Sequence, residues 1–257
     1  RAGEIEADLF ASADAQVIES VLFGAANGQT ARWQVIFCRQ RMALVYSERS
    51  RFRAELEAAA AGTLPWYEVV QQPGFVFKRG DPRNDPGGYR GVLACRLAEL
   101  HYGVPGLADQ LLQGEDSEER IVVGGDFAPL IEGRVDAHLT HATSASRLGL
   151  PMVSLPDEVN QGNPTPAAWY GRVSYTNPLG QMFKGRPLAY GAITGKRTLS
   201  RTMGTPQRLV CASLAADAAE GNDARMRAQA PRPRAAAALA SASAAGRNAM
   251  SQGNVSV

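Results

Sequence analysis

Two short segments of this chain combine residue types that suit the binding of a small anion. They are Ala11-Ser12-Ala13-Asp14 and Asn84-Asp85-Pro86-Gly87-Gly88, and each precedes residues with helical spacing. In an open α/β sheet, ligands bind beyond the carboxyl ends of strands, where the N–H groups of helix starts point outward and favour negative charge. Ser12 adds a hydroxyl donor, and Gly87-Gly88 permits close approach of the backbone to a ligand.

Both segments also have a purely structural interpretation. Ser12 and Asp85 are good helix N-caps, and Pro86 suits the first position of a helix. These residues alone do not decide between helix capping and anion binding.

The sequence contains none of the common motifs of hydrolases or nucleotide-binding enzymes. We find no GxSxG, no HExxH and no GxxxxGK[ST] pattern. Glu99 and His101 on one predicted helix suggest a surface pair rather than a catalytic dyad. Cys38, Cys95 and Cys211 are widely spaced and lack zinc-site spacing, and Cys38 and Cys95 are predicted to be core thiols. The sequence therefore predicts a protein that is not an enzyme and holds no cofactor.

Hydrophobic periodicity predicts strands alternating with helices. We expect strands at 7–11, 33–38, 42–46, 75–77, 121–123, 135–140, 152–155, 173–175 and 187–193, and helices at 17–22, 52–61, 65–70, 89–100, 107–112, 126–132 and 144–148. This alternation indicates an α/β fold with mainly parallel sheets. Residues 215–257 are rich in Ala, Arg, Ser and Pro and are predicted to form a disordered, low-complexity tail.

Charge and hydropathy narrow the classes of partner. The formal net charge of +2 is too small to indicate a nucleic-acid partner. No apolar run approaches the ~18 residues that a membrane-spanning helix needs. The chain starts at Arg1 and shows no leader, which a processed or truncated chain would also lack.

Several segments together resemble the tungstate/molybdate-binding proteins of ABC transporters. That family carries ADvvASAD, NDDPCGYR, QLAELYY, LPDEIN and GKPIVYGITI segments in this order. The matching pieces of this chain are ADLFASAD at 7–14, NDPGGYR at 84–90, LAELHY at 97–102, LPDEVN at 155–160 and GRPLAYGAI at 185–193. Residues 33–47 also resemble the strand pair with which the family enters its second lobe.

The resemblance implies a two-lobed periplasmic-binding-protein fold of type II, with mainly parallel sheets and a hinge. It places lobe 1 at residues 1–42, lobe 2 at 43–186 and a return to lobe 1 at 187–214. The family normally begins with one more strand–loop–helix unit, so the first lobe is expected to be incomplete.

The resemblance also implies a ligand and a site. Molybdate or tungstate would lie between the lobes, with Ser12 donating to its oxygens, Asp85 bonding to the metal centre, and the Gly87 and Gly88 amides beside it. The family's second carboxylate belongs in a DYxFEYxSVA segment, which here reads DAHLTHATSA, with Thr140 at the acidic position. Thr140, His138 or His141 could donate a hydrogen bond instead, or both histidines could be ordinary strand positions.

As a member of such a family, the chain would act as a monomer outside the cytoplasm and dock on a membrane permease of the ABC type. The presence of a leader or a lipid anchor stays open. The alternative functions are a protein of the same fold that binds another small anion, such as sulfate, and an enzyme.

Overall fold

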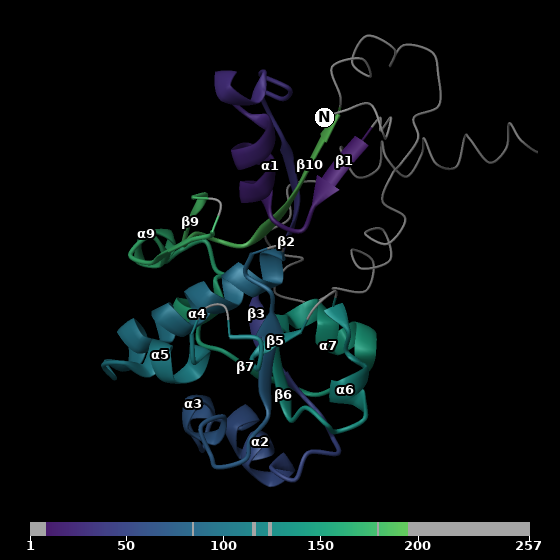
Figure 1. Ribbon diagram of the computed structural model, residues 1–257, viewed down its shortest axis with the longest axis vertical. Coiled ribbons are helices and arrows are strands. Elements are labelled where there is room, and N and C mark those ends of the chain that lie inside the picture. The colour runs from purple at the N-terminus through teal and green to yellow at the C-terminus, as the bar shows by residue number, and fades with distance from the viewer. Residues whose placement is uncertain (1–8, 84, 115–116, 123–124, 179, 195–257) are drawn as a thin grey trace, which may run out of the picture.

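In the described part of the chain the strands form two larger sheets, one above the other in the view of Figure 1, and a small two-stranded sheet. The computed structural model describes residues 9–83, 85–114, 117–122, 125–178 and 180–194. We call the three-stranded sheet with helix α1 (Ala15–Leu22) lobe 1, and the five-stranded sheet with the helices packed on it lobe 2. The predicted tail at 215–257 and Cys211 lie outside the described residues.

The sheet of lobe 2 is mixed but mainly parallel. Its order is β5 (Ile121–Val122), β4 (Phe77–Gly80), β6 (Ala137–His141), β3 (Met42–Tyr46) and β7 (Met152–Ser154). β4 runs parallel to β5 and β6, whereas β3 runs antiparallel to β6 and β7, so only β3 is reversed. All residues of β3 are buried, as expected for a central strand covered on both faces. The predicted α/β fold with a mainly parallel central sheet is confirmed.

Helices cover both faces of this sheet. Helix α4 (Pro86–Tyr102) packs on one face, and α6 (Ala128–Ile131) and α7 (Ala142–Leu148) lie on the other, as Figure 1 shows. The core on the α4 side includes Val92, Leu93 and Leu97, all fully buried. The remaining helices of lobe 2 are α2 (Arg53–Ala60), α3 (Trp66–Val69), α5 (Leu107–Leu112), α8 (Asp157–Asn160) and α9 (Ala167–Tyr170).

Lobe 1 is a small antiparallel sheet with α1 on one face. The strand order is β1 (Leu9–Ser12), β10 (Ala189–Thr194) and β2 (Val35–Arg39), and β10 runs antiparallel to both neighbours. Ile18 of α1 packs against Ile193 of β10. A short 3₁₀ helix, η1 (Ala25–Asn27), follows α1. The expectation of mainly parallel pairing does not hold in this lobe, because β10 returns from lobe 2 through the middle of the sheet.

The chain passes between the lobes at two places that touch each other. The first crossing is at Gln40 and Arg41, between β2 and β3, and the second follows the hairpin of β8 (Ser174–Thr176) and β9 (Met182–Lys184). The N–H of Gln40 donates to the carbonyl of Leu188 at 3.1 Å. The strands predicted at 33–38 and 42–46 therefore exist but belong to different sheets.

Several sequence-based boundaries and environments are wrong in detail. β4 begins at Phe77, where the sequence predicts a strand to end, and β9, α8 and α9 are missing from the prediction. Cys95 is a buried core thiol as predicted, but Cys38 is only half-buried. Cys38 lies on β2, an edge strand whose residues are mostly exposed, and apolar neighbours in sequence do not bury such a position.

The burial pattern of α4 gives a stability prediction. Leu93→Ala should lower the free energy of unfolding by about 2–5 kcal/mol, because it opens a cavity in a fully buried site. Leu100→Ala on the same helix, where the side chain is 37% exposed, should cost less than about 1 kcal/mol. Urea unfolding followed by tryptophan fluorescence measures both, and equal losses would contradict the described orientation of α4.

Candidate functional site

The turn before α1 is held by Asp14 rather than by Ser12. The Asp14 side chain accepts from the N–H of Gln16 at 2.9 Å and is the N-cap of α1. Ser12 is the last residue of β1, and its hydroxyl oxygen accepts from the N–H of Asp14 at 3.2 Å. The prediction that Ser12 caps the helix is wrong, since the strand continues to Ser12. Its hydroxyl proton is left to donate.

The turn before α4 matches the sequence prediction of a capped helix start. Asp85 is the N-cap, Pro86 occupies the first turn, and the carboxylate of Asp85 accepts from the N–H of Gly87 at 3.0 Å. The N–H of Gly88 donates to the backbone carbonyl of Asp85 at 3.0 Å. Both glycine amides that the sequence offered to an anion are therefore engaged within the cap.

A buried ion pair joins the two helix starts. Nε of Arg90, in the first turns of α4, lies 2.6 Å from Oδ2 of Asp14, and the two side chains are 0% and 1% exposed. The hydroxyl of Tyr89 donates to the same carboxylate oxygen. Asp14 lies in lobe 1, whereas Tyr89 and Arg90 lie in lobe 2. The turn that carries Ser12 and the helix that begins at Asp85 are thus connected by the contacts of Asp14 with Tyr89 and Arg90.

Arg90 also contacts the segment that returns to lobe 1. Its Nη1 donates to the side-chain oxygen of Gln161 at 2.9 Å and to the carbonyl of Arg186 at 2.7 Å. Gln161 in turn donates to the carbonyl of Arg90 and accepts from the N–H of Leu188. Nη2 of Arg90 is buried and has no hydrogen-bond partner among the described residues. Sequence reasoning assigned no role to Asp14, Tyr89 or Arg90, although all three lie within the two motifs that it selected.

The end of β6 contributes His141 to this junction and turns Thr140 away from it. Successive residues of a strand point to opposite faces. Thr140 lies 3.5 Å from the hydroxyl of Ser144 on α7, and the ring of His138 packs on Phe127 beside α6. His141 points to the opposite face, near Tyr190 of β10, and the charges of Asp14 and Arg90 both act on it. Nε2 of His141 is buried without a partner in the described part of the chain.

The electrostatics of the two aspartates differ. Burial raises the pKa of Asp14, but the charge and hydrogen bonds of Arg90 outweigh it and keep the pKa below its usual value. For Asp85, partial desolvation and the charge of Asp81 raise the pKa, against the hydrogen bonds from Gly87 and Gly88. The negative charge of Asp14 is therefore balanced by Arg90. The pKa of Asp85 is affected by burial, by Asp81 and by the two glycine amides, and not by a cation.

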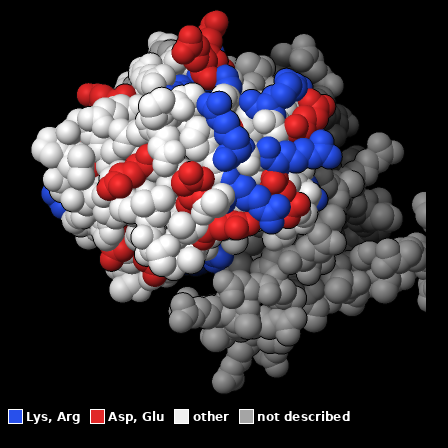
Figure 2. Space-filling view, turned by 90° about the horizontal axis from the view of Figure 1, so that it is seen from below, with Lys and Arg blue, Asp and Glu red and all other residues white. Residues whose placement is uncertain are grey.

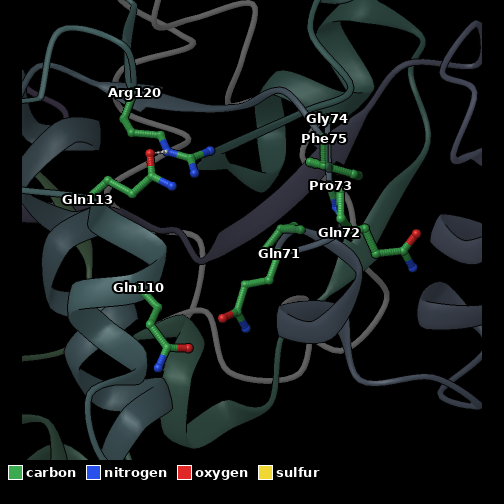
Figure 3. Close-up of a pocket in the computed structure, with 9 residues that line it drawn as sticks. Gln71, Gln72, Pro73, Gly74, Phe75, Gln110, Gln113 and Arg120 are labelled. Carbon is green, nitrogen blue, oxygen red and sulfur yellow. Dashed lines mark hydrogen bonds between the residues drawn. The ribbon is translucent and has the colours of Figure 1, made fainter.

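A distinct cavity of about 420 Å³ opens elsewhere in lobe 2. The side chain of Gln71 points toward Gln110 of α5 across it, and Nε of Arg120 donates to the side chain of Gln113, just after α5, at 3.1 Å (Figure 3). Its lining includes none of the predicted site residues. On the face of lobe 2 seen in Figure 2, basic and acidic side chains are interleaved. Within the described ranges, no group of three or more His, Cys, Asp or Glu side chains suits a metal ion.

The sequence of this chain is similar to one protein family and to several known solute-binding proteins. A family described as bacterial extracellular solute-binding protein matches residues 1–194. The molybdate/tungstate-binding protein of Thermococcus kodakarensis is 27% identical over 220 residues, covering 77% of this chain and 60% of the relative. A putative ABC transporter molybdenum-binding protein of Haloferax volcanii is 28% identical over 185 residues, 72% of this chain and 56% of the relative.

An uncharacterized solute-binding protein of Petrotoga mobilis is 28% identical over 191 residues, covering 72% of this chain and 57% of the relative. The chain thus spans less than two thirds of the length of these relatives. The match of the family, together with the mixed α/β architecture, confirms the predicted periplasmic-binding-protein fold.

The start of α4 gives a prediction about its two glycines. A Cβ atom on Gly88 would lie 2.3 Å from the backbone of Asp81, so Gly88→Ala should destabilise the protein by about 1–3 kcal/mol or more. A Cβ atom on Gly87 meets only the movable carboxylate of Asp85, at 3.2 Å, so Gly87→Ala should stay within about 1 kcal/mol of the wild type. Urea titration of the two variants would refute the described loop if Gly88→Ala were the more stable.

The buried histidines predict a loss of stability on mild acidification. Burial lowers the pKa of His138 and of His141 to about 4, against ~6.5 in the unfolded chain. Below pH ~6.5 the unfolded state binds protons that the folded state does not, so stability falls as the pH drops towards 4, by up to about 3 kcal/mol for each histidine. Unfolding free energies at pH 7 and pH 5 test this.

The variant His141→Gln provides the control for this pH dependence. It should show a smaller difference in unfolding free energy between pH 7 and pH 5 than the wild type, because one titrating group is gone. An unchanged difference would mean that His141 titrates normally in the folded protein.

Proposed function

The chain belongs to the bacterial extracellular solute-binding protein family, and from this premise we propose that it binds molybdate or tungstate between its two lobes as part of an ABC importer. Relatives named for molybdate and tungstate binding support the choice of ligand. Its work would be to capture and release the anion without chemical conversion, none of the metal–oxygen bonds of the oxyanion being broken.

The single observation that carries the proposal is the junction of two helix starts from different lobes. The turns before α1 and α4, which the resemblance marked as anion-binding, are joined through Asp14, Tyr89 and Arg90. The hydroxyl of Ser12 can donate to an oxyanion oxygen there, and the buried Nη2 of Arg90 and Nε2 of His141 lie in the same neighbourhood. Concentrated donors at helix starts suit a dianion.

Asp85 is the proposed ligand of the metal centre. A carboxylate beside a dianion is unfavourable by charge alone, and bonding to a hexavalent metal is what makes it favourable. Desolvation and the charge of Asp81 raise the pKa of Asp85, so its negative charge is poorly stabilised without a ligand. Bonding to an electron-poor metal centre would stabilise that charge. Since Gly87 and Gly88 donate within the cap, their amides would contact the anion only after the cap rearranges.

On the far wall of the site we favour His141 over Thr140. Thr140 turns towards Ser144 on the face of α7, whereas His141 lies on the face of α4. With its pKa lowered to about 4 by burial, His141 is neutral at neutral pH and can donate one N–H to an oxyanion. A single carboxylate plus a neutral donor would then replace the pair of carboxylates implied by the resemblance.

The partners and the location follow from the same proposal. We expect a monomer that works outside the cytoplasm and docks on a membrane permease of the ABC type. No helix in the described ranges combines the length and apolar character that crossing a bilayer requires. A sulfate-binding protein of the same fold is the second candidate, because sulfate has the same shape and charge but its sulfur does not accept a fifth ligand.

Replacing Asp85 by Asn separates capping from ligand binding. Asn is also a good N-cap, so Asp85→Asn should keep the melting temperature close to that of the wild type. Loss of the bond to the metal should weaken tungstate binding about tenfold or more, as measured by isothermal titration calorimetry. Sulfate should compete weakly with tungstate in the wild type.

Asp126→Asn is the matched control. Asp126 is exposed and lies one residue before Phe127, the N-cap of α6. Its carboxylate accepts from the N–H two residues on, that of Ala128 at 2.9 Å, as Asp85 does from Gly87, but away from the site. This variant should bind tungstate like the wild type. Equal affinities of the Asp85→Asn and Asp126→Asn variants would reduce Asp85 to a capping residue, and preference for sulfate would select the second candidate.

A further inference from the structure

Arg90 makes charged or polar contacts with three separate parts of the molecule. Its Nε binds the Asp14 carboxylate of lobe 1, and its Nη1 binds Gln161 of lobe 2 and the carbonyl of Arg186, in the segment that crosses between the lobes. We propose that Arg90 is a positioning residue that fixes the spacing of the two lobes before any anion binds. This goes beyond the proposed function, which assigns contacts to the anion but says nothing of what sets the spacing of the lobes without it.

The geometry of the contact favours one relative orientation of the lobes. A guanidinium group is planar and its N–H donors point in fixed directions, so its acceptors must hold fixed positions at the same time. The Asp14 carboxylate is held equally firmly, because it accepts from Gln16, Tyr89 and Arg90. Any rotation of lobe 1 against lobe 2 would break several of these bonds together.

Burial makes the loss of either partner costly. Both side chains are essentially inaccessible to water, and removing one charge would leave the other buried without compensation. The second ion pair between α1 and the crossing segment, Glu19–Arg186 at 2.7 Å, has side chains 39% and 34% exposed. Pairs so exposed contribute little to stability. Of these two ion pairs, only that of Asp14 and Arg90 is therefore strong enough to fix the spacing of the lobes.

A distance between the lobes, measured without ligand, tests the proposal. Spin labels on Ser20→Cys of α1 and Ala60→Cys of α2 report the spacing by double electron–electron resonance, because both positions are exposed. Cys38 and Cys211 would be replaced by Ser, while the fully buried Cys95 stays. The full chain should give one narrow distance distribution, and Arg90→Met should give a broader one shifted to longer distances.

Arg79→Met is the matched control for loss of a buried arginine. Arg79 is also fully buried, but its described hydrogen bonds, to the carbonyls of Gly80 and Gly114, stay within lobe 2. This variant should lose stability and keep the wild-type distance distribution. If folded Arg90→Met kept the wild-type distribution, or if Arg79→Met broadened it equally, Arg90 would be only a structural residue.

A second variant covers the case in which Arg90→Met does not fold. Asp14→Asn removes the charge but keeps an acceptor for the N–H of Gln16, so the cap of α1 survives. It should broaden the lobe distances in the same direction, and unchanged distances in this variant would overturn the proposal.

The link to anion binding rests on the proposed function and is measured separately. If the lobes of Asp14→Asn spend about a tenth as much time closed, its tungstate affinity should fall about tenfold. If the wild type did not bind tungstate but gave the predicted lobe distances, the proposed ligand would be wrong and the proposed role of Arg90 would still hold. If the wild type bound tungstate but no variant changed the lobe distances, the proposed ligand would hold and the proposed role of Arg90 would be wrong.

Discussion

The buried pair of Asp14 and Arg90 is the constraint on which the rest of the structure depends. A carboxylate and a guanidinium withdrawn from water must stay together, and these two belong to different lobes. Because Asp14 also caps α1, and Arg90 lies in the first turns of α4, the pair aligns the starts of two helices. The crossing segment at Arg186 is tied to the same arginine. One contact thus relates both lobes and their connection.

This arrangement limits what the two helix starts could donate to the proposed anion. Each N-terminus is already satisfied by its own aspartate, Asp14 for α1 and Asp85 for α4. The two aspartates are not equivalent, because Asp14 is neutralised by Arg90 whereas Asp85 lies beside Asp81. In the proposed function, Asp85 is therefore the carboxylate that would bind the metal centre of the anion. His141, whose pKa burial lowers to about 4, would be the neutral donor on the opposite wall.

Local patterns predict most of the elements but not their partners. The helical spacing of apolar residues predicts α4, and a continuous apolar run predicts β3. Asp85-Pro86 correctly marks where α4 begins. Ser12 misled the prediction because Ser and Asp are both good N-caps and Ser12 lies only two positions before Asp14. Whether Thr140 or His141 faces the junction depends on the register of β6 against β3, and the pairing of Asp14 with Arg90 spans 76 positions. Contacts at such separations arise from tertiary packing and leave no periodic signal.

The most direct test of the account is a crystal of the protein grown with tungstate and measured at a wavelength where tungsten scatters anomalously. The account predicts one strong tungsten peak between the lobes, within bonding distance of the Asp85 carboxylate and close to Ser12 and His141. A peak elsewhere on the molecule, or none at saturating tungstate, would contradict it.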